Sequence, residues 1–154
     1  MQAAEFKRRR RQLMGMMGTG SIAILPTGSE AVRNRDVLFP FRPDSDFYYL
    51  TGFAEPDAVL VLIPGRRQGE YILFCREKDP AKEIWDGYRA GVEGAVADFG
   101  ADDAFPITDL DDILPGLMEE RERVFFAMGS DPAFDQRVSD WVSQVRSRAR
   151  AGVH

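Results

Sequence analysis

The acidic pair Asp44 and Asp46 is a candidate for chemistry, because it lies beside Arg42 and directly before a run of aromatic residues. On an extended chain two acids at this spacing share a face, and a neighbouring like charge raises the pKa of one of them. On a helix the same residues are ordinary caps of the first turn. The sequence leaves both interpretations open and favours capping.

Histidine usage narrows the kinds of active site that this chain can hold. His154 is the only histidine, and a base at a fraying terminus argues against a Ser-His-Asp or Cys-His nucleophilic site. The same count excludes a zinc site of the usual His-rich or Cys-rich kind. An all-carboxylate site for a hard cation stays open. We therefore assign no catalytic residue in this chain.

A second candidate is Trp85, within the segment 83–91, where Asp-Gly and Tyr-Arg follow the indole near a predicted helix end. This tryptophan is not needed to complete the apolar face of a helix. One interpretation is a surface loop that offers an aromatic ring and a guanidinium to a partner or ligand. The other is a packed aromatic beside a snorkelling arginine.

These residues must be positioned by a fold organised around the apolar run 58–63, which has no polar alternation and predicts a central strand with both faces covered. The aromatic segment 42–53 before it must lie in a core, in an interface or at a pocket wall. Strands and helices interleave, which predicts a single α/β domain with a mixed β-sheet and helices on both faces. The predicted strands are 21–25, 59–63, 71–75, 103–107 and a buried strand at 124–128, and the predicted helices are 4–17, 80–86, 91–99, a helix capped by Thr108 or Asp109 and running through Glu120, and one from Pro132.

Composition excludes several classes of partner. The chain has 154 residues, 44% of them hydrophobic, and a net charge of −5. This charge argues against a general nucleic-acid binder, and no apolar stretch approaches the roughly 20 residues that span a bilayer. Cys75 is the only cysteine, so no internal disulfide forms, which suits a reducing cytoplasm.

Four segments, in this order and spacing, resemble the N-terminal domain of bacterial Xaa-Pro aminopeptidase (aminopeptidase P), a domain type also found in prolidase and creatinase. They are Glu5–Arg10, Asp44–Phe53, Glu55–Ile63 and Glu83–Gly87. The resemblance covers nearly the whole chain. It divides the chain into the domain itself, residues 1–146, and the start of a linker to an absent catalytic domain, residues 147–154.

The resemblance implies that the domain precedes a "pita-bread" catalytic domain, which holds two metal ions, usually Mn²⁺, on two Asp, one His and two Glu. The catalytic domain removes the N-terminal residue of a peptide when the next residue is proline. No cofactor is expected in this chain, and alone it is expected to be inactive.

The resemblance also implies partners and site residues. The expected partners are the catalytic domain of the same polypeptide, further copies in a homo-oligomer, and proline-containing peptides. In the family's tetramers this domain lies near the active site of a neighbouring subunit. Trp85 resembles the residue that walls the neighbour's substrate pocket, and Asp36 resembles an acid that lines the same region. The alternative is a stand-alone binding module with the aromatic-acidic segment as its partner surface.

Overall fold

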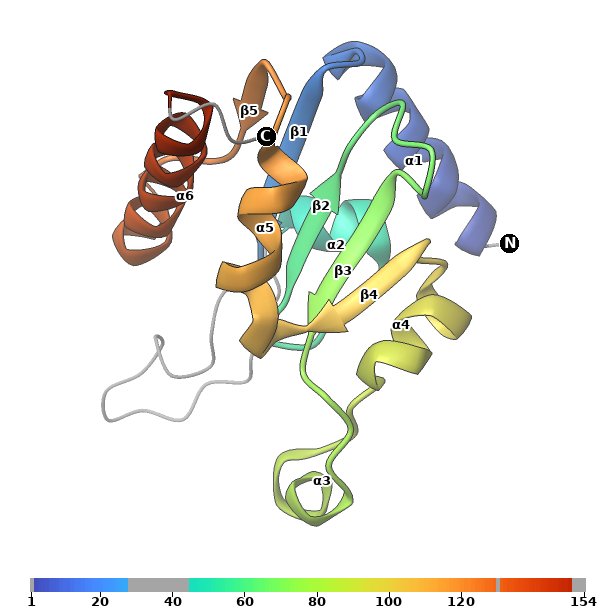
Figure 1. The fold of residues 1–154 in the computed structure, drawn as a ribbon. Helices are drawn as coiled ribbons and strands as arrows, with labels where there is room; N and C mark the ends of the chain where they lie inside the picture. Colours follow the sequence, from blue (N-terminus) through green and yellow to red (C-terminus); the bar gives the residue numbers. More distant parts are fainter. Residues whose placement is uncertain (1, 28–44, 130, 151–154) are drawn as a thin grey trace.

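The computed structural model describes residues 2–27, 45–129 and 131–150, which form one α/β unit (Figure 1). The helices are Gln2–Met17 (α1), Ser45–Thr51 (α2), Pro80–Asp86 (α3), Gly91–Phe99 (α4), Leu110–Met118 (α5) and Pro132–Arg150 (α6). The strands are Ser21–Pro26 (β1), Val59–Leu62 (β2), Tyr71–Cys75 (β3), Asp103–Pro106 (β4) and Arg123–Phe125 (β5). A 3-10 turn at Ile107–Asp109 leads into α5.

The five described strands make one mixed sheet in the order β4-β3-β2-β1-β5. The two central pairs, β1 with β2 and β2 with β3, are antiparallel, as expected for the hairpin between β2 and β3. The outer pairs, β1 with β5 and β3 with β4, are parallel. This arrangement confirms the predicted mixed sheet, with the apolar run of β2 at its centre.

Both faces of the sheet are covered, which explains why β2 reads as an unbroken apolar run. Leu60 and Leu62 point into a cluster shared with α1, α2 and α4, whereas Val59 and Val61 point into a second cluster shared with α5 and α6. All four side chains are buried. Successive side chains of a strand alternate between its two faces, so each face of β2 needs a helical layer to cover it. The predicted helices on both faces of the sheet are confirmed.

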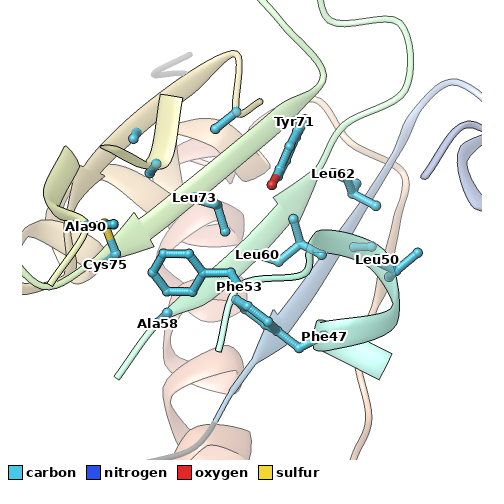
Figure 2. Packing of buried hydrophobic residues seen from close by; sticks show 14 of the residues in the cluster. Phe47, Leu50, Phe53, Ala58, Leu60, Leu62, Tyr71, Leu73, Cys75 and Ala90 are labelled. Atoms are coloured by element: carbon cyan, nitrogen blue, oxygen red, sulfur yellow. The ribbon is translucent and has the colours of Figure 1, made fainter. Parts of the chain in front are cut away.

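The described part of the aromatic segment, residues 45–53, forms α2 and the turn after it, and helical spacing divides its side chains between core and solvent. Phe47, Leu50 and Phe53 are buried and point toward the sheet, as Figure 2 shows. Tyr48 and Tyr49 are 45% and 52% exposed. The Phe53 ring lies 4.9 Å from that of Phe99 and 6.2 Å from that of Phe47. The segment is therefore a helix rather than an extended chain, and it anchors one core.

One predicted strand differs from the structure in its bounds and burial. The run 124–128 was expected to be a buried strand, but β5 covers Arg123–Phe125 and both of its end residues are exposed. The physical reason is its place at the sheet edge, where only β1 pairs with it and the helices leave it partly uncovered. At the C-terminal side, α6 continues through Arg150, and the boundary between domain and linker at residues 146 and 147 stays a prediction.

Candidate functional site

The α3 arm, residues 78–89, is the part of the described chain that stands apart from the sheet. Figure 1 shows α3 at the far end of the molecule, between β3 and α4. None of its described side chains is buried or belongs to either core cluster. It carries three large exposed apolar side chains, Ile84 at 78%, Trp85 at 86% and Tyr88 at 65% exposure.

Local sequence signals begin and end α3 as predicted. Asp79 is the N-cap, and its Oδ1 accepts a hydrogen bond from the Lys82 backbone N–H at 3.2 Å. Pro80 occupies the first helical position, where a missing N–H costs nothing. Gly87 ends the helix with φ of +97°, and its N–H donates to the Glu83 carbonyl at 3.1 Å. These signals place Trp85 in the last turn, facing solvent.

The Glu83 carboxylate lies within the arm and accepts hydrogen bonds from three donors. Lys78 Nζ and the backbone N–H of Asp79 and of Arg89 each lie 3.1 Å from one of its oxygens. The Arg89 N–H and the Lys78 ammonium favour the charged form and hold the pKa of Glu83 below its ordinary value. Lys78 Nζ also lies 4.2 Å from the centroid of the Tyr88 ring. The arm is thus internally bonded although it packs on no core.

The structure settles part of what the sequence left open. Trp85 is exposed, so the interpretation as a packed aromatic is wrong for the described chain. Asp36 and Asp44 lie outside the described residues, so the acidic pair cannot be measured. Asp46 is exposed in the first turn of α2, which agrees with the capping interpretation.

The described residues do not offer the ligand set of a two-metal centre. Within ranges 2–27, 45–129 and 131–150, no three His, Cys, Asp or Glu side chains come close enough to hold a metal ion. No step of chemistry is therefore assigned to a metal held by these residues. What the arm offers is an exposed indole, a large apolar surface that a second surface can cover.

A hollow of about 680 Å³ lies away from the arm, beside α1, α2 and α4, and it is lined in part by Arg10, Tyr71 and Asp102. Arg10 is buried there. Its Nη1 donates to the Leu50 carbonyl at 2.9 Å, and its guanidinium lies 3.9 Å from the centroid of the Tyr71 ring. The Leu50 carbonyl belongs to the last turn of α2, where a cation is favourable. Arg10 thus connects α1 to α2 and β3, and we assign it to the fold.

Comparison with known proteins decides the family. Residues 6–126 match the family described as Aminopeptidase P, N-terminal domain. The chain belongs to this family. The Xaa-Pro aminopeptidase of Escherichia coli K12 is 36% identical over 147 residues, which are 95% of this chain and 33% of that protein. Human Xaa-Pro aminopeptidase 3 is 33% identical over 92% of this chain and 30% of its own length.

Solved aminopeptidase structures share the fold of this N-terminal domain. Aminopeptidase PepP of Pseudomonas aeruginosa superposes with a TM-score of 0.91 at 58% identity, over 99% of this chain and 34% of that one. The low-pH form of Escherichia coli aminopeptidase P gives a TM-score of 0.88 at 35% identity, over 97% of this chain and 34% of that one. The chain therefore spans about a third of the length of the relatives that it matches.

Sequence reasoning identified Trp85 but missed the residues that hold its arm. Glu83 was noted only as part of a family segment, and its three hydrogen-bond donors were not foreseen. A signal was present, since Asp79 followed four residues later by Glu83 resembles a capping box shifted by one position. Separately, no described helix combines the length and the hydropathy that crossing a lipid bilayer requires.

Proposed function

We propose that this chain is the non-catalytic N-terminal domain of a manganese-dependent Xaa-Pro aminopeptidase, and that it contributes to subunit assembly and to the wall of a substrate pocket. The parent enzyme would remove the N-terminal residue that precedes proline. Family membership supports this proposal, together with the names of the relatives, which are Xaa-Pro aminopeptidases about three times as long as this chain.

The observation that carries the proposal is the 86% exposure of Trp85 on an arm that packs on neither core. Exposure of an indole to water is unfavourable, and tryptophan is enriched at interfaces between protein surfaces. An internally bonded arm that carries such a side chain outward is therefore expected to meet a second surface. In this proposal that surface is the active-site entrance of a neighbouring subunit.

The chemical role of Trp85 would be to cover the prolyl ring of the substrate and to exclude water from it. Asp36 would line the same region, a role that rests on its resemblance to an acid of the family. Hydrolysis itself would use residues outside these 154, where two Mn²⁺ ions would activate a water molecule. The residues of this chain would bind and orient the substrate rather than cleave it.

The proposed partners are the catalytic domain of the same polypeptide, further copies of it in a homo-oligomer, and proline-containing peptides. The proposed compartment is the cytoplasm. Cys75, the only cysteine of the chain, is a free thiol, which suits a reducing compartment. Burial raises the pKa of this thiol to about 11. A neutral, covered thiol of this kind is a packing residue and not a reactive one.

Because the proposal assigns hydrolysis to a separate catalytic domain, it predicts different peptidase activities for this chain and for the full-length protein. With Mn²⁺ and an Xaa-Pro peptide, the 154-residue chain should give no turnover, whereas the full-length protein should release the N-terminal amino acid. Product release is measured by chromatography of the free amino acid. Robust turnover by the 154-residue chain would contradict the proposal. A coding sequence with no catalytic segment downstream would instead support the stand-alone binding module.

A further inference from the structure

The α3 arm poses a problem of stability that the proposed function does not address. Ordering the backbone of each residue costs conformational entropy, which buried apolar surface usually offsets. Residues 78–89 have no buried described side chain. Polar contacts must therefore keep the arm ordered, and the carboxylates of Glu83 and Glu55 make most of them.

Glu83 joins the two sides of the arm. Its donors are Lys78 and Asp79, which precede α3, and Arg89, which follows it. One carboxylate therefore connects the chain that enters the arm to the chain that leaves it. The bond from the Asp79 N–H adds to the cap of α3, as in a capping box. The bonds from Lys78 Nζ and from the Arg89 N–H come from outside the helix and fix how α3 sits on its two flanking segments.

Glu55 does the same at the base of the arm. Its Oε2 accepts from the Ala90 N–H at 2.8 Å, and its Oε1 lies 3.4 Å from Arg76 Nη2, just beyond the end of β3. Gly91 permits a close approach of the two chain segments, since it has φ of +74° and a Cβ there would clash with Lys78 Cγ at 2.7 Å. Glu55 thus attaches the base of the arm, at Ala90, to the rest of the domain. Glu83 in turn holds α3 to the two segments that lead to this base.

We propose that Glu83 is a positioning residue that fixes the direction of Trp85 relative to the body of the domain, with Glu55 fixing the base of the arm. Its consequence for catalysis rests on the proposed function. Without Glu83 the arm would sample several directions, and only some of them would place the indole on the substrate. An apparent dissociation constant rises as the competent fraction falls.

The direct test is the motion of Trp85 in the 154-residue chain, which needs no activity. Its tryptophans are Trp85, 86% exposed, and Trp141, 3% exposed. In Glu83→Ala, time-resolved fluorescence anisotropy should show at least about a twofold larger amplitude of nanosecond local motion. Glu83→Gln should lie between Glu83→Ala and wild type. Alanine is the better helix former, so the change cannot come from lost helix propensity.

Two controls keep this measurement specific. Trp85→Phe removes the reporting indole and should abolish the difference between Glu83→Ala and the parent. Glu93→Gln changes an exposed carboxylate in the first turn of α4 and should leave the anisotropy unchanged. Unaltered local motion of Trp85 in Glu83→Ala would overturn the proposal. So would global unfolding of both Glu83→Ala and Glu83→Gln, because Glu83 would then support the fold as a whole.

The second test uses the kinetics of the full-length protein. Glu83→Ala should raise KM for a short Xaa-Pro peptide about fivefold with kcat nearly unchanged, because saturating substrate selects the competent arm. The double variant with Trp85→Ala should be no worse than Trp85→Ala alone. Additive losses would overturn the proposal. If Trp85→Ala has no kinetic effect, the proposed function fails, and the anisotropy alone still decides whether Glu83 positions the arm.

Discussion

Replacing Trp85 with alanine in the full-length protein is expected to lower kcat/KM for a short Xaa-Pro peptide by about 10- to 100-fold. Burying an aromatic side chain against substrate contributes about 1.5–3 kcal/mol, which corresponds to this range. The measurement is steady-state release of the N-terminal amino acid. Longer peptides should lose less, because they make further contacts that Trp85 does not provide.

The fold of the domain should survive this replacement, because the side chain is 86% exposed and belongs to neither core cluster. Met16→Ala is a matched control, since it removes another large apolar side chain that is 84% exposed on α1. It should leave kcat/KM unchanged. Equal kinetics for wild type and Trp85→Ala would remove the pocket role, and loss of the circular-dichroism signal in the variant would show that Trp85 supports the fold.

Replacing Phe53 with alanine is expected to destabilise the domain by about 3–5 kcal/mol, the usual cost of emptying a buried aromatic site. Phe53 is fully buried, lies between the rings of Phe47 and Phe99, and faces the sheet in Figure 2. Urea unfolding of the 154-residue chain, followed by far-ultraviolet circular dichroism, measures the change in the free energy of unfolding.

Tyr48→Ala is the matched control within the same aromatic segment. Tyr48 is 45% exposed, belongs to neither core cluster, and makes an edge contact with the Phe6 ring. Its replacement should cost less than about 1 kcal/mol. A cost for Phe53→Ala no larger than that for Tyr48→Ala would contradict the division of this segment into a core face and a solvent face.

The sequence predicts the fold well where burial is strong and local. The unbroken apolar run of β2 predicts two covered faces, and Asp79, Pro80 and Gly87 predict the bounds of α3, because caps and turns depend on neighbours along the chain. The prediction is wrong at β5, because the run 124–128 is apolar enough for a buried strand, whereas the strand covers Arg123–Phe125 and its end residues are exposed. Their exposure depends on the position of the strand at the sheet edge, which hydropathy does not encode.

The candidate site is predicted less completely, because its contacts are distant in sequence. Trp85 is recognised since it does not fit an apolar helix face and lies in a family segment. Glu55 is not recognised, because its contact with the Ala90 N–H joins residues 35 positions apart. Glu83 lies closer to its partners, yet its role depends on the arm folding back on itself. Asp36 stays a prediction, since it lies outside the described residues.

The central claim is that Trp85 serves the active site of a neighbouring subunit, and subunit mixing tests it most directly. Full-length Trp85→Ala subunits are mixed and reassembled with subunits that lack metal ligands but retain Trp85. If the indole acts across the interface, random reassembly of equal amounts should raise the activity per Trp85→Ala subunit to about half of the wild-type value, because about half of the intact sites then have a neighbour that carries Trp85. If Trp85 acts within its own subunit, the activity per Trp85→Ala subunit stays at the low value of that variant alone, and the claim is wrong.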